Sequence, residues 1–249
     1  MHLGVILPNF GRDSTPETIR RTAEAAEELG FDSVWATEHV LVGPEAVDPY
    51  GRVYAPLVTL AWIAAFTERV ALGTSIVLAP LHHPVHLAKE AATLQELSGG
   101  RLRLGLGMGW HEDEFRFLGA EFKGRGRRGD EAIRLMRALW RGERSFSGRH
   151  WSFENATFAP LPDPEPELWF GGSSERTVRR TLEHGGVWHP SRGGDAERVR
   201  EVRREHPELP TVPRTRLENV EEVLEAGADG VVVTLGDAAA MRDFVRRYR

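Results

Sequence analysis

The chain has 249 residues, of which 41% are hydrophobic and 28% are charged, and its net charge is −5. This composition supports a packed core and excludes a disordered chain, and the negative charge disfavours nucleic acid as a general partner. No apolar run approaches the roughly 20 residues of a membrane-spanning helix, and the absence of cysteine excludes disulfides, thiolate nucleophiles and cysteine-zinc sites.

Strand-like and helical patterns alternate from the N-terminus onward. The first strand begins at Leu3 without a basic leader before it, so we expect a cytoplasmic protein. A helix is predicted over 16–29, with Ser14 and Thr15 as candidate N-caps and Gly30 as its stop. The strands are predicted at residues 3–8, 33–37, 70–77, 101–109, 168–171, 186–189, 211–214 and 231–235. The later helices are predicted at 57–66, 84–97, 112–144 with a break at 124–126, 174–184, 195–206, 218–226 and 238–248.

Two long segments interrupt this alternation. Residues 43–56 form a loop rich in Gly and Pro, and residues 145–166 lack helical periodicity and contain several prolines. We predict that residues 145–166 form an excursion near the barrel mouth, passing over it. Because no linker divides the chain, the alternation predicts one α/β domain over residues 1–249, a TIM (β/α)8 barrel.

In a TIM barrel the active site lies at the C-terminal ends of the strands. The residues at the predicted strand ends are Asn9, Glu38, His39, Thr74, Ser75, Ile76, Gly107, Gly109, Trp110, Gly171, Gly172, Ser173, Ser174, Trp188 and His189. This set lacks a nucleophile backed by a base and lacks a lysine, which disfavours covalent and Schiff-base chemistry. Glycines and aromatic walls instead suit a flat ring system.

The stretch 105–115 is the most distinctive of these strand ends. Glycines at alternate positions, 105, 107 and 109, leave one face without side chains, so that a large group can lie against the backbone. The acids at 112–114 then favour the start of a helix through its macrodipole. The pattern predicts a ligand-binding strand end.

Three polar motifs each have two interpretations. His39 follows a strand directly and is either a general acid or base or a loop histidine that binds a carbonyl. Residues 171–174, Gly-Gly-Ser-Ser, present either a phosphate site at a helix start or an ordinary turn with a serine cap, and alone favour the turn. His82, His83 and His86 have helical spacing for a metal, but no carboxylate accompanies them in the sequence, so exposed imidazoles are preferred and no metal site is predicted. Arginines at 125–128 favour a solvated face, with an anionic cofactor tail as the alternative.

Several of these stretches, taken together and in order over about residues 3–192, resemble the bacterial luciferase-like oxidoreductases, specifically their deazaflavin (coenzyme F-420) dependent branch. The matching stretches are 24–35, 38–39, 69–75, 83–94, 98–101, 105–115, 169–172 and 186–190. The resemblance implies a TIM barrel that holds a flavin or deazaflavin at its strand ends. It also implies a cis peptide bond at Ser75-Ile76, behind the ring.

The resemblance further implies roles for individual residues. His39 lies near the reacting ring as acid or base, while Gly107 and Gly109 line the cofactor's chain. Its phosphate is held by Gly171, Gly172, Ser173 and Ser174. The remaining cofactor contacts are assigned to Glu38, Thr74, Ser75, Ile76 and Trp110.

The function implied is hydride transfer between reduced coenzyme F-420 and a small organic substrate. An FMN-dependent monooxygenase supplied by a separate reductase is the first alternative, and a non-catalytic flavin- or deazaflavin-binding protein is the second. A metal-dependent barrel hydrolase is the outsider. A sugar phosphate is disfavoured as substrate, since Arg192 and Arg214 are the only basic residues near the last strand ends. Homodimerisation through the helices after the second and third strands is a family expectation.

Overall fold

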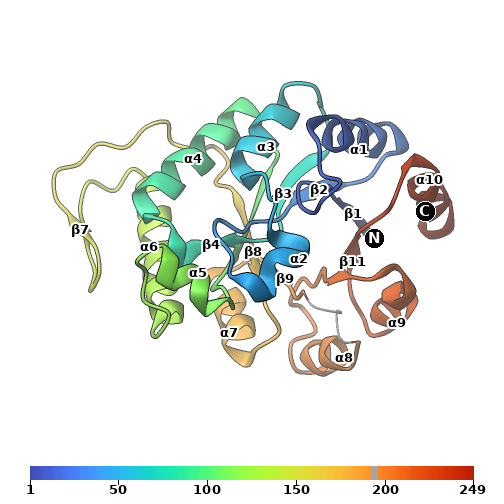
Figure 1. The fold of residues 1–249 in the computed structure, drawn as a ribbon. Helices are drawn as coiled ribbons and strands as arrows, with labels where there is room; N and C mark the ends of the chain where they lie inside the picture. Colours follow the sequence, from blue (N-terminus) through green and yellow to red (C-terminus); the bar gives the residue numbers. More distant parts are fainter. Residues whose placement is uncertain (192–195) are drawn as a thin grey trace.

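The computed structural model describes residues 1–191 and 196–249, in which strands and helices alternate around a central barrel (Figure 1). The strands are β1 (His2–Ile6), β2 (Ser33–Ala36), β3 (Ala71–Thr74), β4 (Val77–Leu78), β5 (Leu102–Gly107), β6 (Phe146–Ser147), β7 (Ser152–Phe153), β8 (Glu167–Gly171), β9 (Val187–His189), β10 (Arg214–Thr215) and β11 (Gly230–Val233). The α-helices are α1 (Pro16–Leu29), α2 (Val47–Tyr50), α3 (Pro56–Ala64), α4 (Pro84–Leu97), α5 (Glu112–Phe117), α6 (Arg125–Trp140), α7 (Glu175–His184), α8 (Ala196–Glu205), α9 (Val220–Glu225) and α10 (Ala238–Tyr248). Short 3-10 turns are η1 (Pro44–Ala46), η2 (Ala79–Leu81) and η3 (Leu217–Asn219).

The large sheet is parallel and closes into a barrel. Its hydrogen-bonded order is β10, β11, β1, β2, β3, β5, β8 and β9, with β4 beside β5. Closure occurs between β9 and the segment leading into β10, where the Trp188 N–H donates to Pro210 O and the Arg214 N–H to Pro190 O, both at 2.8 Å. With β3 and β4 counted as one interrupted strand, the order contains eight barrel positions, which confirms the predicted TIM barrel.

Local signals fix the helix ends. Thr15 caps α1 by accepting from the Thr18 N–H, and Gly30 ends the helix in the left-handed region at φ 81°. Both ends of α1 agree with the prediction. The helix predicted over 112–144 breaks earlier than the predicted position, 124–126. In the structure α5 ends at Phe117 and α6 begins at Arg125. The helix predicted from residue 195 begins at Ala196 in the structure, and Asp195 lies outside the described residues.

Two predicted strands differ from the structure. The strand predicted over 70–77 is divided into β3 and β4 at the Ser75-Ile76 peptide bond, which is cis, as the family resemblance implied. The strand predicted over 211–214 appears as a bridge at Thr211 followed by β10. Pro213 has no N–H to donate, so it interrupts the hydrogen-bond ladder between these two parts.

Large aromatic side chains fill the barrel interior. Trp35 and Trp169 contact each other with ring centroids 4.5 Å apart, and Trp35 stacks on His189 at 5.0 Å. A Cβ on Gly73, in the neighbouring strand β3, would lie 2.2 Å from the Trp35 ring, so only glycine fits at position 73. The interior is therefore a packed core, and space for a ligand is confined to the mouth.

Residues 145–166 do not lie over the mouth, which corrects that prediction. The segment connects the end of α6 to the start of β8, and its hairpin of β6 and β7 lies outside α4 and α6, at the left of Figure 1. Glu131 of α6 accepts hydrogen bonds from the His150 and Trp151 N–H groups, at 2.7 and 3.0 Å. Contact between Trp151 and His83 brings the tip beside the amino end of α4.

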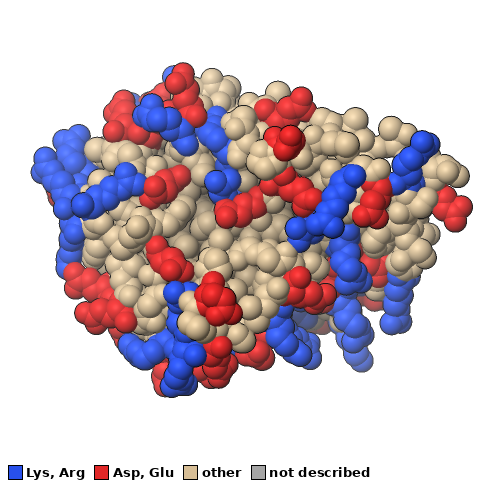
Figure 2. Space-filling model, turned by 180° about the vertical axis from the view of Figure 1, so that it is seen from behind, with Lys and Arg blue, Asp and Glu red and all other residues tan. Residues whose placement is uncertain are grey.

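Charge is dispersed on the face opposite the view of Figure 1. Figure 2 shows basic and acidic side chains interspersed over this face, with uncharged surface between them. Among the described residues, no helix has both the length and the apolar character that crossing a membrane requires.

Candidate active site

The centre of the mouth is a hydrogen-bonded cluster around the cis peptide. The Ser75 carbonyl accepts from Arg214 Nη1 at 3.1 Å and from Thr37 Oγ1 at 3.3 Å. Asn9, at the end of β1, joins the cluster because its amide bonds both the Thr37 N–H and the Thr37 carbonyl, at 2.9 and 2.8 Å. Four strand ends are thus tied together, which holds the mouth in one arrangement.

His189 anchors this cluster from below. Its Nδ1 lies 2.6 Å from the Val212 carbonyl and its Nε2 lies 2.9 Å from Ser75 Oγ. A carbonyl only accepts, so Nδ1 carries the proton and Nε2 accepts from the serine hydroxyl. Complete burial lowers the pKa of His189 to about 3, against the opposing hydrogen bond to Val212. His189 is therefore neutral at physiological pH and serves as a fixed acceptor.

Glycines around the bulge make room for protein atoms. A Cβ on Gly105 would lie 1.8 Å from the Thr74 carbonyl oxygen, and one on Gly107 would lie 1.6 Å from Ile76 Cδ1. A Cβ on Gly171 would lie 2.7 Å from Cγ2 of the same Ile76 side chain. The glycines on this face therefore make room for the bulge between β3 and β4. The sequence pattern predicts only that they make room for a ligand.

His39 is held by a carboxylate from a distant part of the chain. Its Nδ1 lies 2.9 Å from Oε2 of Glu114 in α5, whose Oε1 accepts from the Val40 N–H at 2.6 Å. Burial acts to raise the pKa of Glu114, but hydrogen bonds from His39 and Val40 outweigh it, so that its pKa is lowered. An ionised Glu114 accepts the Nδ1 proton, which leaves His39 Nε2 as the nitrogen available to a ligand.

Aromatic rings continue from His39 along one wall of the mouth. Tyr50 packs on the His39 ring with ring centroids 4.2 Å apart, and Trp110 lies edge-on to the His39 ring at 6.0 Å. A cavity of about 370 Å³ opens beside this wall, between the segments 39–42 and 47–53. It is lined by His39, Val40, Leu41, Val42, Val47, Tyr50, Gly51, Arg52 and Val53.

Glu38 and Thr74 are engaged with protein groups. Glu38 accepts from the Leu78 N–H at 2.6 Å and pairs with His82 Nε2 at 3.0 Å, and the Thr74 hydroxyl donates to Gly105 O at 2.8 Å. These contacts brace the bulge, so we assign both side chains a positioning role. His82 also departs from the predicted exposed imidazole: burial acts to lower its pKa, but the Glu38 contact outweighs it and raises the pKa. His83 and His86 are exposed or nearly so, as expected.

The turn into α7 retains the features of an anion site. Ser174 is the N-cap, accepting from the Thr177 N–H at 3.3 Å, and Ser173 and Ser174 are exposed. Helix N-termini of this kind bind phosphate through free N–H groups. On the neighbouring strand, Arg125 donates to Gly109 O at 3.0 Å, so this arginine of the 125–128 cluster reaches the end of β5.

A family model of luciferase-like monooxygenases matches residues 1–208. The chain belongs to the luciferase-like monooxygenase family. It is 37% identical over 162 residues to an F420-dependent glucose-6-phosphate dehydrogenase of Beutenbergia cavernae, covering 62% of this chain and 46% of that protein. It is 30% identical over 166 residues to the oxygenase component of a flavin-dependent trigonelline monooxygenase of Acinetobacter baylyi, covering 65% of this chain and 44% of that protein.

The match thus spans less than half the length of both curated relatives. Among solved structures, an F420-dependent secondary alcohol dehydrogenase in complex with an F420-acetone adduct has a TM-score of 0.81 at 16% identity, over 98% of this chain and 97% of that chain. At this identity the likeness concerns the fold alone. The relatives use two different cofactors, so family membership leaves the choice between them open.

This luciferase-like mouth fits a flat ring with an anionic tail. The aromatic wall of His39, Tyr50 and Trp110 offers ring faces, and the α7 turn and Arg125 offer anion contacts at the ends of β8 and β5. Within the described residues, no group of three or more potential metal ligands is gathered.

The sequence interpretation missed three residues of this luciferase-like site. In the sequence, Glu114 is one of the acids that favour a helix start, and Tyr50 belongs to the loop 43–56, which has no predicted role. A signal for Glu114 does exist: His111, Glu114 and Phe115 share one helical face, and all three are buried. Arg214 was considered only for a sugar phosphate, and Arg192, its companion in that argument, lies outside the described residues.

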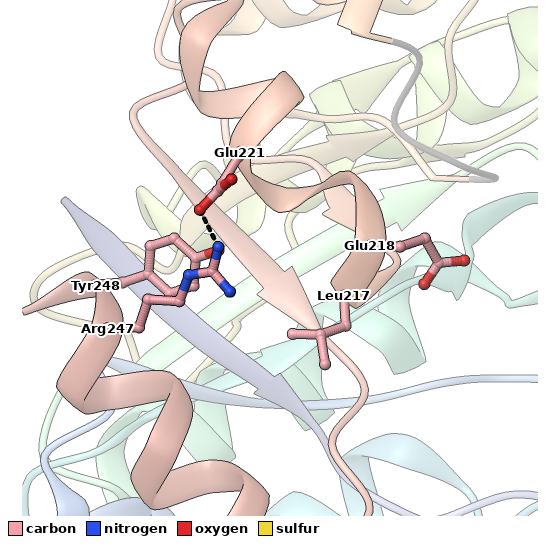
Figure 3. Close-up of a pocket in the computed structure, with 5 residues that line it drawn as sticks. All are labelled: Leu217, Glu218, Glu221, Arg247 and Tyr248. Carbon is pink, nitrogen blue, oxygen red and sulfur yellow. Dashed lines mark hydrogen bonds and ion pairs between the residues drawn. The ribbon is translucent and has the colours of Figure 1, made fainter.

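A second hollow, of about 320 Å³, lies away from the strand ends, between η3, α9 and α10 (Figure 3). Its cation, Arg247, is already paired with Glu221. The lining residues are Leu217, Glu218, Glu221, Arg247 and Tyr248. Because no strand-end residue lines it, this hollow plays no part in the site.

The lowered pKa of Glu114 predicts how stability depends on pH. In the unfolded chain the Glu114 carboxylate takes up a proton near pH 4.5, and in the folded chain it does so only at lower pH. Its contribution to the free energy of unfolding is therefore present above pH 4.5 and is lost as the pH falls through the pKa of the folded state. Glu114→Gln should lower the free energy of unfolding by about 1–3 kcal/mol at neutral pH, because it weakens two partly buried hydrogen bonds. The difference in the free energy of unfolding between the variant and the wild type should become smaller at acidic pH.

Urea denaturation of both proteins at a series of pH values measures this difference. The His189 contribution cancels in the difference, since both proteins retain that residue. Glu112→Gln, in the same helical turn but on its exposed side, is the matched control and should follow the wild type. A difference that stays constant from neutral to strongly acidic pH would show that Glu114 is not ionised in the folded protein.

Proposed function

We propose that this protein transfers a hydride between reduced coenzyme F-420 and a small organic substrate, with His39 as the acid or base. The observation that carries the proposal is the His39-Glu114 pair, which fixes an imidazole at a strand end beside a cavity. A buried carboxylate that orients a histidine is the usual arrangement for proton transfer. It also counts against a cofactor-binding protein without turnover, which would not require a positioned proton donor.

Each part of the mouth has a distinct role in this proposal. A bound deazaflavin would supply the hydride, while Ile76 and the cis peptide support its ring from behind. Gly107 and Gly109 lie along its chain, and the turn of Gly171, Gly172, Ser173 and Ser174 takes the phosphate. Trp110 and Tyr50 limit access of water to His39, whose Nε2 is the nitrogen that takes up or gives up the transferred proton.

Two features favour coenzyme F-420 over FMN. The F420-dependent relative is the more similar of the two named relatives, at 37% against 30% identity. Arg125 and the exposed Arg127 lie near the end of β5, where a longer anionic tail would leave the barrel. The match to a flavin-dependent oxygenase component supports the alternative, an FMN-dependent monooxygenase with a separate reductase as partner.

Equilibrium titration of the purified protein with each cofactor tests the proposal. We expect quenching of coenzyme F-420 fluorescence with saturable binding, and weaker binding of FMN. Arg127→Gln should weaken F-420 binding more than FMN binding, whereas Arg204→Gln, an exposed arginine on α8, should change neither. Tight binding of FMN without binding of F-420 would overturn the choice of cofactor in favour of the monooxygenase.

Assembly and location stay predictions. The outer face of α3 is apolar and exposed, with Val58 72% and Trp62 40% accessible, which supports the expected homodimer through the helices after the second and third strands. The cytoplasmic location also stays a prediction.

A further inference from the structure

We propose that the substrate of this protein carries a carboxylate, which the free edge of the Arg214 guanidinium binds at the barrel mouth. The inference deepens the proposed function and rests on it, because it places the substrate in the mouth that contains His39. It names a substrate class, an organic acid, and a residue that selects for it.

Arg214 reaches across the mouth from β10. Its Nη1 donates to Thr37 Oγ1 at 3.0 Å and to the Ser75 carbonyl at 3.1 Å, on the side of β2 and β3. These partners are 177 and 139 positions away in the sequence. The guanidinium is therefore fixed in one orientation across the opening before any ligand arrives.

The other edge of this guanidinium carries two donor nitrogens, Nε and Nη2. Neither Nε nor Nη2 of Arg214 has a hydrogen bond to a residue within 1–191 or 196–249. Nε–H and one Nη2–H point in parallel, and this pair of donors matches the two oxygens of a carboxylate. An arginine fixed through Nη1 with its side edge free is preorganised for bidentate binding.

The charge of Arg214 also requires a partner. In the part of the chain that the structure describes, no carboxylate forms an ion pair with it, although the side chain is partly buried. Burial removes water from the guanidinium and so lowers the pKa of Arg214. A cation in such surroundings attracts an anion more strongly than a surface cation does.

Arg214 and His39 belong to one wall. The guanidinium lies 5.7 Å from the centre of the Phe10 ring, Phe10 is 5.7 Å from Tyr50, and Tyr50 is 4.2 Å from His39. A small planar acid held at Arg214 would lie along these rings and extend toward His39. The apolar rings suit the body of such a substrate, while Arg214 fixes its orientation.

A structural role for Arg214 would give different results. If it only braces the Ser75 carbonyl, its removal should weaken stability and cofactor binding without changing which ligands bind. If it binds a carboxylate, its removal should abolish a preference between an acid and its neutral analogue. The two roles are separable by comparing matched ligands.

The experiment measures dissociation constants for three acids and their primary amides: propionate, benzoate and cinnamate against propionamide, benzamide and cinnamamide. The cofactor-loaded protein is used, with whichever of F-420 or FMN binds, and the change in cofactor absorbance reports ligand binding. We expect the wild type to bind at least one acid about tenfold or more tightly than its amide, the range of a charge-assisted pair. Arg214→Gln should remove this preference, and Arg214→Lys should keep part of it.

Arg216→Gln is the matched control, since Arg216 is an exposed arginine two residues away that faces Glu218. It should keep the full preference. Should Arg214→Gln fail to hold cofactor, the acid-amide ratios of the wild type and Arg214→Lys decide. Equal binding of acids and amides by the wild type, binding of none of the six, or an unchanged preference in the Arg214 variants would overturn the inference. The cofactor titration tests the proposed function separately, so a failure of one is distinguishable from a failure of the other.

Discussion

Replacement of His39 by alanine should lower kcat on the order of 100- to 1,000-fold, which is the usual contribution of a positioned general acid or base. The reason is geometric: Glu114 and the rings of Tyr50 and Trp110 hold the imidazole, so no other side chain can take its place. Binding of the cofactor should change little. Oxidation of reduced coenzyme F-420 by the acceptor that the wild type turns over measures the loss.

Two further variants define what this loss means. His39→Gln retains a hydrogen bond to Glu114 but carries no titratable proton, so it should be about as inactive as the alanine variant. His86→Ala removes an exposed histidine on α4 and should behave as the wild type. A His39→Ala enzyme with wild-type turnover would refute the acid-base role, and equal losses of cofactor affinity and kcat would indicate a binding role instead.

Replacement of Gly105 by alanine should cause the largest loss of stability among the glycine positions of the bulge. The new Cβ would lie 1.8 Å from the Thr74 carbonyl oxygen, a backbone atom that cannot rotate away. We expect the free energy of unfolding to fall by about 3 kcal/mol, at the upper end for overpacking. In a domain of this size, the melting temperature should then fall by roughly 6–12 °C.

Two other glycines, Gly107 and Gly236, should show smaller losses of stability when replaced by alanine. Gly107→Ala should cost less, because its Cβ would meet the end of the Ile76 side chain, which has other rotamers. Gly236→Ala, with nothing within 4 Å of the added Cβ, should melt as the wild type does. Equal melting temperatures for the Gly105 and Gly236 variants would show that the bulge adapts easily and that close approach is not why residue 105 is glycine.

The sequence by itself determined the features that depend on near neighbours. The alternation of strands and helices gave the barrel, and the caps at Thr15 and Gly30 gave both ends of α1, because caps and periodicity act within a few residues. His39 could be named as a candidate strand-end residue for the same reason, since it directly follows a strand, while its acid-base role came from the family resemblance and stays a prediction. The cis bond at Ser75-Ile76 came from the family resemblance and not from local propensity.

Only the tertiary structure decided which strand-end residues meet. His39 and Glu114 are 75 positions apart, and Arg214 contacts residues 139 and 177 positions away, so no local pattern could pair them. Closure of the barrel brings the ends of β2, β3, β5 and β10 to one mouth, and that contact converts an acid of a helix start into the partner of a histidine. It also decided that Glu38 braces the bulge and that residues 145–166 pack outside α4 and α6. Such pairings depend on the geometry of the closed sheet, which the periodicity of a single strand or helix does not encode.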